Sequence, residues 1–157
     1  MNYWLVKSEG DCYSIDDLKR DKRADWTGIR NYQSRNFMMR DMQVGDQVLY
    51  YHSGGSATKP TGVYGIAKVA SKAHPDPTQF DKKSEYYDPK ATKEKPIWYS
   101  LHIAFVRKLK EPITLTELKI NPALDGMLVR ARGSRLSIQP VSKRHFEYIV
   151  SLSKNQD

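Results

Sequence analysis

Cysteine and long apolar runs are scarce in this sequence. Its 157 residues include one cysteine, Cys12, which excludes an intramolecular disulfide framework and any metal site built from several cysteines. No run of about 18 apolar residues occurs, and no charged start is followed by an apolar stretch. We therefore expect neither a membrane span nor a secretion signal. The expected location is intracellular: the cytoplasm, association with a nucleoid, or the nucleus if the source is a eukaryote.

The common catalytic and phosphate-binding motifs are missing as well. The sequence has no G-x-S-x-G, H-E-x-x-H, G-x-x-x-x-G-K-[ST] or G-x-G-x-x-G pattern. The loop 54–59 is rich in Gly, Ser and Thr and ends in Lys59, but Pro60 follows and the spacing is not that of a phosphate-binding loop. These absences argue against an enzyme and against a cofactor.

Histidines and loop carboxylates form no recognisable metal or acid–base motif. No two histidines share a ligand spacing that would support zinc; they are His52, His74, His102 and His145. Four carboxylates stand among prolines and lysines, where we expect a solvated loop rather than an acid–base pair: Asp76, Asp81, Glu85 and Asp88. The sequence therefore predicts neither a metal site nor a catalytic residue.

Positive charge is in excess and unevenly distributed. The net charge is +8 and the isoelectric point is near 9.5. Residues 51–110 carry 11 basic and 5 acidic side chains, whereas residues 1–50 carry 8 of each. Such an excess attracts polyanions through counterion release and long-range steering. Acidic proteins and anionic membranes would be attracted by the same charge. Nucleic acid is the expected partner, and the lack of long apolar runs disfavours a membrane partner.

Short strands and short helices alternate irregularly along the chain. Because the strands are not separated by helices of 10–15 residues, a doubly wound parallel sheet is disfavoured and a small sheet curled toward a barrel is favoured. We expect one α+β domain over 1–157, with a long loop at about 72–96. Strands are predicted at 3–6, 47–52, 63–69, 98–109 and 136–141. Helices are predicted at about 14–20, 31–42, 114–121 and 142–152.

The segment 26–36 is rich in aromatic, amide and basic side chains. Trp26 offers a face on which a base can stack, and Asn31 offers a donor and an acceptor to a base edge. Gly28 permits close approach, and Arg30 and Arg35 can reach phosphates. The alternatives remain a core position for Trp26 and solvated arginines. The arginines Arg130, Arg132 and Arg135 form either a phosphate clamp or an exposed turn.

Energetics limit what one tryptophan can do. Extruding a base from a duplex costs a few kcal/mol, and one aromatic stack returns about 1–3 kcal/mol. A base pocket therefore needs a second aromatic side chain and hydrogen bonds in addition to Trp26.

Several motifs together resemble the EVE domain family, and they follow in order through nearly the whole chain. They are Tyr3-Trp4-Leu5-Val6-Lys7-Ser8-Glu9, the Trp26–Asn36 segment, Tyr51-His52-Ser53, Gly62-Val63-x-Gly65-Ile66-Ala67 and Arg135-Leu136-Ser137-x-Gln139-Pro140-Val141. The resemblance implies a PUA-like curled β-barrel of about five to six strands with peripheral short helices, related to YTH domains. It also implies binding of a modified base, a modified cytosine in DNA, in an aromatic pocket.

The resemblance nominates two sets of residues. The base pocket would contain Lys7, Ser8, Trp26, Gly28, Asn31, Tyr32, Tyr51, His52 and Ser53. The nucleic-acid backbone would be met by Arg30, Arg35, Arg130, Arg132 and Arg135.

Three hypotheses follow, with a monomer favoured in each. The first is a non-catalytic reader of a modified base. The second is a PUA-like RNA-binding module that recognises shape, with Trp26 in the core. The third is a hydrolase or base-modifying enzyme that uses His52 with Ser53 or a loop carboxylate, although no third, orienting group is evident.

Overall fold

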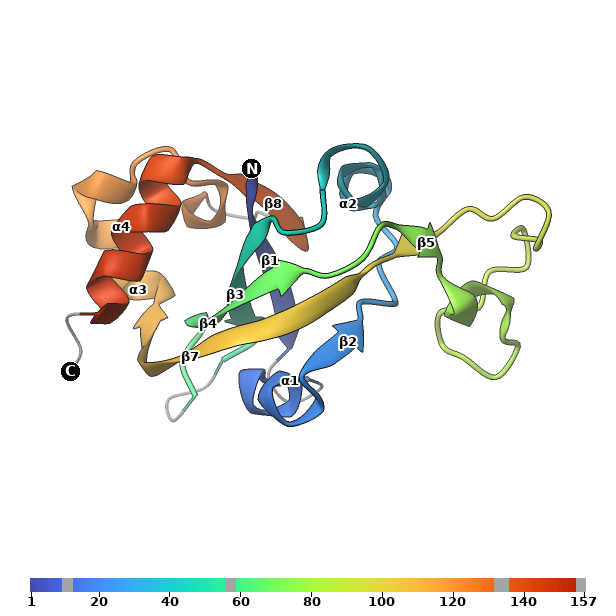
Figure 1. Ribbon diagram of the computed structural model, residues 1–157, viewed down its shortest axis with the longest axis horizontal. Helices are drawn as coiled ribbons and strands as arrows, with labels where there is room; N and C mark the ends of the chain where they lie inside the picture. The colour runs from blue at the N-terminus through green and yellow to red at the C-terminus, as the bar shows by residue number, and fades with distance from the viewer. Residues whose placement is uncertain (10–12, 56–58, 132–135, 155–157) are drawn as a thin grey trace.

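Six strands form one mixed sheet in the computed structural model, which describes residues 1–9, 13–55, 59–131 and 136–154 (Figure 1). The strand order is β2-β7-β4-β3-β1-β8, and only β1 and β3 run parallel among these neighbours. The sheet curls into a half-barrel, which confirms the predicted α+β class. The strands are β1 Tyr3–Glu9, β2 Arg23–Asp25, β3 Gln47–Ser53, β4 Gly62–Val69, β7 His102–Thr114 and β8 Ile138–Val141.

Both faces of the central sheet are buried, because successive side chains of a strand point to opposite faces. On one face, Val6 and Tyr50 join a core cluster that also contains Trp26. On the other face, Leu5 and Tyr51 join a second cluster. The two clusters explain why β1 and β3 are apolar at consecutive positions instead of alternating with polar residues.

Short helices cover these two faces. α1 (Ile15–Asp21) and α2 (Tyr32–Asn36), which continues into the π-helical turn η1 (Phe37–Asp41), lie on the face that contains Trp26. α3 (Leu115–Ile120) and α4 (Lys143–Lys154) lie together on the other face (Figure 1). None of the helices in the described parts of the chain is long and apolar enough to cross a membrane.

Local sequence signals explain where the helices begin. The Ser14 side chain accepts a hydrogen bond from the Asp17 amide, and the Asp17 carboxylate accepts one from the Ser14 amide, so the two residues form a capping box at the start of α1. Thr114 caps α3, and the Ser142 hydroxyl accepts from the His145 amide in the first turn of α4. The predicted helices are therefore confirmed in position.

The sheet departs from the sequence prediction in two places. The predicted strand 98–109 is divided into β6 (Tyr99–Ser100), which pairs with β5 (His74–Pro75), and β7. The short strand β2 was not predicted, because its three residues carry no apolar pattern. Gly65 marks an irregularity within β4, since the register with β7 shifts there and a Cβ atom would lie 2.5 Å from the Ile15 side chain.

The long loop at 72–96 forms an arm that extends from the side of the sheet away from α3 and α4 (Figure 1). Its root is organised around the buried Gln79 in the 3₁₀ turn η2 (Pro77–Phe80). The Gln79 amide donates to the carbonyls of Asp76 and Trp98 at 2.8 and 2.7 Å, and accepts from the amides of Ile97 and Trp98 at 3.0 and 2.8 Å. The irregular arm is therefore fastened at its root by a fully bonded buried side chain.

Candidate nucleic-acid interface

The strands β1 and β3 divide the nominated pocket residues between the two faces of the sheet. Lys7 pairs with Tyr51 and Ser8 with His52 in the β1–β3 register. The Lys7 ammonium lies 5.8 Å from the centre of the Tyr51 ring, and Tyr51 belongs to the core on the α3 and α4 side. Ser8 and His52 point to the opposite face, toward Tyr50 and α1. The structure thus brings Ser8 and His52 to the Trp26 side and sets Lys7 and Tyr51 apart from it.

Trp26 lies in the core and is 9% exposed. Its amide donates to the Leu101 carbonyl at 2.8 Å, which fixes the segment after β2 against the sheet. The rings of Tyr13 and Tyr50 lie 6.1 and 5.5 Å away, at angles of 74° and 79° to the indole. Neither tyrosine is stacked parallel on the indole, and both meet it edge to face.

The main-chain carbonyl of Tyr13 ties this aromatic group to the sheet. It accepts hydrogen bonds from the hydroxyls of Ser8 and Tyr50, each at 2.7 Å. Burial raises the pKa of Tyr50 well above its ordinary value, so its hydroxyl remains a donor at neutral pH. Tyr13 was not nominated from the sequence. The only signal for it was its position directly before the capping residue Ser14.

His52 lies at the wall of a cavity of about 560 Å³, between the first turn of α1 and the lysines of β7. Its ring stacks on Tyr64, with centroids 3.9 Å apart and planes at 14°. Its Nε2 accepts a hydrogen bond from the Ile15 amide at 3.1 Å, and burial lowers the pKa of His52 to about 4. Ser53 shares the cavity, and its hydroxyl donates to the Ser8 carbonyl at 3.4 Å. Both nominated residues therefore face this cavity.

The nominated residues of the 28–35 segment lie where that segment meets the arm. The Tyr32 ring lies 4.8 Å from the Trp98 ring, and the Arg35 guanidinium lies 4.8 Å from the Tyr32 ring centre. The Arg30 guanidinium lies 5.4 Å from the ring centres of both Trp98 and Tyr86. These planar groups form a half-exposed aromatic and cationic surface, in which Tyr32 is 58% exposed. Trp98, which the sequence placed at the start of a strand, is 6% exposed and lies beneath this surface.

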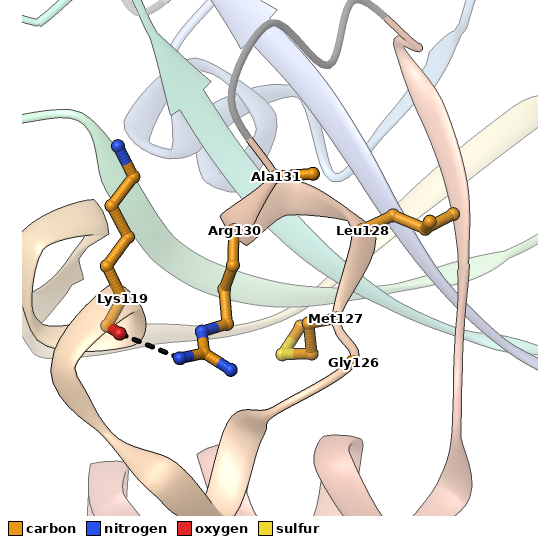
Figure 2. Close-up of a pocket in the computed structure, with 6 residues that line it drawn as sticks. All are labelled: Lys119, Gly126, Met127, Leu128, Arg130 and Ala131. Atoms are coloured by element: carbon orange, nitrogen blue, oxygen red, sulfur yellow. Dashed lines mark hydrogen bonds between the residues drawn. The ribbon is translucent and has the colours of Figure 1, made fainter.

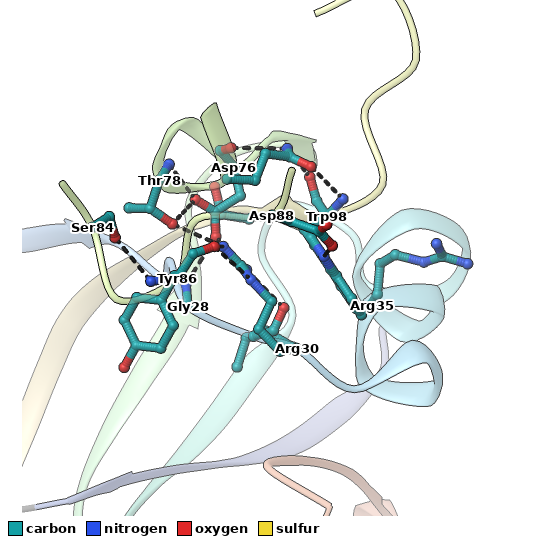
Figure 3. Close-up of polar contacts among 12 residues, drawn as sticks. Gly28, Arg30, Arg35, Asp76, Thr78, Ser84, Tyr86, Asp88 and Trp98 are labelled. Carbon is teal, nitrogen blue, oxygen red and sulfur yellow. Dashed lines mark hydrogen bonds and ion pairs between the residues drawn. The ribbon is translucent and has the colours of Figure 1, made fainter. Parts of the chain in front are cut away.

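Arg30 and Asp76 join the segment to the arm (Figure 3). Asp76 is fully buried, and its Oδ2 lies 3.1 Å from Arg30 Nη1 and accepts from the Gly28 amide at 2.8 Å. Arg30 also donates to the Thr78 hydroxyl and to the Tyr86 carbonyl, at 2.9 and 2.8 Å. The expectation of a solvated Asp76 is therefore wrong. The neighbouring prolines and lysines gave no indication that this carboxylate is buried against an arginine 46 residues away.

Hydrogen bonding keeps Asp76 ionised. Burial raises its pKa, but donors from Thr78, Gly28 and Arg30 outweigh that effect and hold the pKa below its ordinary value. Gly28 has a φ of +85°, and a Cβ atom there would lie 2.9 Å from the Tyr86 ring. The predicted close approach at Gly28 therefore occurs in this structure with Tyr86 of the chain itself.

Asn31 and Arg35 are partly occupied by contacts within the chain. Asn31 is exposed and caps α2, since its Oδ1 accepts from the Ser34 amide at 2.9 Å. Its NH₂ group is consequently the part best placed to meet a ligand. Arg35 donates to the Asn36 side chain at 2.9 Å and to the Ile97 carbonyl at 3.0 Å.

Arg130 lies apart from these residues, in the 3₁₀ turn η4 (Leu128–Arg130) beside α3 (Figure 2). It pairs with Asp125 Oδ1 at 2.6 Å and donates to the Lys119 carbonyl at 2.7 Å. Its side chain borders a shallow depression that is also lined by Met127 and Leu128. Arg132 and Arg135 lie outside the described residues.

Comparison with known proteins decides the family. Residues 2–152 match the EVE domain. The chain belongs to the EVE domain family. It is 37% identical to mouse thymocyte nuclear protein 1 over 99% of this chain and 75% of that protein.

Two solved structures show how closely the fold of this EVE-domain chain is shared. A hypothetical protein from Leishmania major is 47% identical, with a TM-score of 0.91 over 99% of this chain and 96% of that one. The human THYN1 protein, crystallised in complex with DNA containing 5-methylcytosine, is 35% identical, with a TM-score of 0.89 over 100% of both chains. The similarity spans every described element of the sheet.

Proposed function

We propose that this EVE domain is a non-catalytic, intracellular reader that binds DNA carrying a modified cytosine. The observation that carries the proposal is the complex of the human THYN1 protein with DNA containing 5-methylcytosine, whose fold matches this chain over its full length. The net charge of +8 supports attraction to DNA without regard to sequence.

The face of the sheet that holds Ser8, Tyr13 and Trp26 is the best candidate for the base site. Two hydroxyls, one backbone carbonyl and three aromatic rings converge there. A flipped base needs more than one stack, and Tyr13 is a second ring beside Trp26. Because Trp26 is 9% exposed, a base can reach its face only if neighbouring side chains move. The Asn31 NH₂ group is proposed to donate to the base from the rim.

The surroundings of His52 support the non-catalytic part of the proposal. A general base works best when its pKa is close to the operating pH, whereas burial lowers the pKa of His52 to about 4. Its Nε2 already accepts from the Ile15 amide, and the Ser53 hydroxyl donates to a backbone carbonyl. A serine–histidine pair of the hydrolase kind is therefore not what these contacts favour.

Two DNA duplexes that differ only in the methyl group on cytosine test the proposed reader function. We expect 5-methylcytosine DNA to bind more tightly than the same duplex with plain cytosine, by about 10–200-fold at most, because one methyl group supplies about 1–3 kcal/mol. The Trp26→Phe variant keeps an aromatic core but offers less stacking surface, and should lose about tenfold in affinity for the modified duplex. Met39→Ala, which alters an exposed side chain of η1, is the control and should leave binding unchanged.

The burial of Trp26 also favours one rival, an RNA-binding module in which this side chain is only structural. That rival predicts equal affinity for modified and plain duplexes, tighter binding of structured RNA, and an unfolded Trp26→Ala variant. Equal affinities for the modified and plain duplexes would overturn the reader hypothesis. Turnover of modified nucleotides that His52→Ala abolishes would instead require the enzyme hypothesis.

A further inference from the structure

Three side chains that are remote in sequence meet at the root of the arm. Asp25 on β2 lies opposite His102 on β7, and His74 on β5 lies opposite Ser100 on β6. Ser100 and His102 are two residues apart on one extended segment and therefore face the same side. The β2–β7 pair and the β5–β6 pair lie on either side of this segment. Together they place the side chains of Asp25, His74 and His102 on a common face. One ligand atom from each lies within 4.8 Å of the others.

His74 meets two hydrogen-bond acceptors through its two ring nitrogens. Nε2 lies 3.0 Å from Asp25 Oδ2, and Nδ1 lies 3.4 Å from the Lys72 carbonyl. A neutral imidazole carries one hydrogen, so it can donate to only one of these acceptors at a time. The tautomer that donates to the Lys72 carbonyl presents the Nε2 lone pair toward Asp25 Oδ2, which is the arrangement that a metal ion between the two side chains would use.

A second observation at Asp25 points the same way. Its Oδ1 is buried and has no hydrogen-bond partner among the described residues, which is costly for a carboxylate oxygen. The Ser100 hydroxyl lies 3.1 Å from His74 Nε2 and completes the polar lining of the cluster. A backbone carbonyl that orients the outer nitrogen of a histidine, as Lys72 does for His74, is the usual second partner of a metal-binding imidazole.

We propose that Asp25, His74 and His102 form a binding site for a divalent transition-metal ion of the zinc class. Imidazole and carboxylate ligands suit Zn²⁺ and Co²⁺, whereas Mg²⁺ and Ca²⁺ prefer oxygen ligands throughout. Metal–ligand bonds of about 2.0–2.2 Å place tetrahedral ligand atoms about 3.4 Å apart, which small side-chain movements reach from the observed spacing. The histidines are 28 residues apart in the chain, so no local sequence motif indicates the site.

Arg23 is the cation that competes with the metal. Its Nε donates to His102 Nδ1 at 2.9 Å, and its exposed side chain also donates to the Ala70 carbonyl at 3.4 Å. A hydrogen donated to Nδ1 leaves Nε2 protonated in a neutral ring, so His102 can bind a metal only after Arg23 moves away. Arg23 therefore weakens metal binding both by blocking the ring and by its charge.

The position of the site gives metal binding a structural consequence. Asp25 directly precedes Trp26, and His74 lies two residues before Asp76. A bound metal ion would join β2 to the root of the arm, next to the Arg30–Asp76 contact. The proposed metal site does not depend on DNA binding, because the three ligands and the competing arginine all belong to this chain.

Titration of the full, untagged chain with Zn²⁺, and with Co²⁺ followed by its visible absorption, tests the site. We expect saturable 1:1 binding that falls at least about tenfold in His74→Ala and in His102→Ala, and that also weakens in Asp25→Asn. Arg23→Gln should bind about tenfold more tightly than the parent chain. A purely structural cluster gives no reason for metal affinity to rise when a neighbouring side chain is removed. Tighter binding in Arg23→Gln would therefore distinguish a metal site from such a cluster.

His145→Gln is the matched control, since this histidine lies on α4 and outside the cluster. It should bind metal as the parent chain does, with circular dichroism confirming that each variant is folded. Failure to saturate at about 1 mM metal would overturn the proposal and leave the contact between His74 and Asp25 as a structural one. Equal loss in His145→Gln, or weaker binding in Arg23→Gln, would overturn it too.

Discussion

His52 occupies the junction between the end of β3 and the first turn of α1, and its contacts couple protonation to folding. The neutral ring stacks on Tyr64 and accepts from the Ile15 amide through Nε2. Protonation would remove that acceptor and place a charge at the start of a helix, where the backbone amides already make the local potential positive. The histidine that the family resemblance assigned to a base pocket therefore also stabilises the α1–β3 junction.

Stability should consequently decrease in mild acid. The pKa of His52 is about 4 in the folded chain and near 6.5 when unfolded, so the unfolded chain binds more protons between these values. The contribution of His52 is complete above about pH 6.5 and is lost as the pH falls toward 4, by about 1–3 kcal/mol. Urea unfolding at several pH values measures this change in the free energy of unfolding. His52→Gln keeps an acceptor but does not titrate, so its curve should be flatter; identical curves would contradict this assignment.

Residue types in the binding segment were readable from the sequence, but their partners were not. The close approach at Gly28 was foreseen because glycine permits it, yet the neighbour is Tyr86, 58 residues later. Asn31 was nominated for its amide, and its additional role as a helix cap follows from its place before α2. Burial of Trp26 was one of two alternatives, since tryptophan is common both in cores and in stacking sites.

The elements differ in how far local sequence determines them. Capping residues and apolar runs located the helices and the main strands, because those signals act within a few residues. β2, β5 and β6 are two or three residues long and exist only through pairing with distant segments. The arm likewise depends on contacts between Gln79 or Asp76 and remote residues. Long-range pairing of this kind leaves no periodic signal in the chain.

The attachment of the arm to the 26–31 segment should depend on Arg30. Removing one member of a mostly buried ion pair leaves the other charge without its partner, and Asp76 is fully buried. We expect Arg30→Ala to lower the free energy of unfolding by about 2–4 kcal/mol. Amides of the arm should also exchange with solvent faster, as hydrogen exchange would measure.

Arg20→Ala is the matched control for Arg30→Ala. Arg20 pairs with Asp17 and Asp21 on the surface of α1, with its side chain 67% exposed. Solvent screens exposed ion pairs, so they contribute little to stability, and this variant should remain close to the parent chain in stability and in arm exchange. If both variants behave alike, the arm is held by its aromatic contacts and not by the Arg30–Asp76 pair.

At the scale of the whole molecule, the proposed function assigns attraction and recognition to different parts of the chain. Residues 51–110 supply most of the positive charge, whereas residues 1–50 are neutral overall and contain Ser8, Tyr13 and Trp26. Attraction to phosphates weakens as salt displaces it, while stacking and hydrogen bonding to one base depend little on ionic strength. DNA affinity and discrimination between cytosines should therefore respond differently to salt.

Raising the salt concentration from 50 to 200 mM should weaken binding of both duplexes by about 100-fold if four phosphates are contacted. The ratio of the two dissociation constants, modified over plain, should stay constant across that range, because the counterion contribution is common to both. Fluorescence anisotropy at four or five salt concentrations gives both quantities. Lys82→Ala, an exposed arm residue, should reduce the salt slope by about one if it meets a phosphate, again without changing the ratio. A ratio that collapses with salt would place discrimination in the charge distribution, and the aromatic cluster around Trp26 would then lose its assigned role.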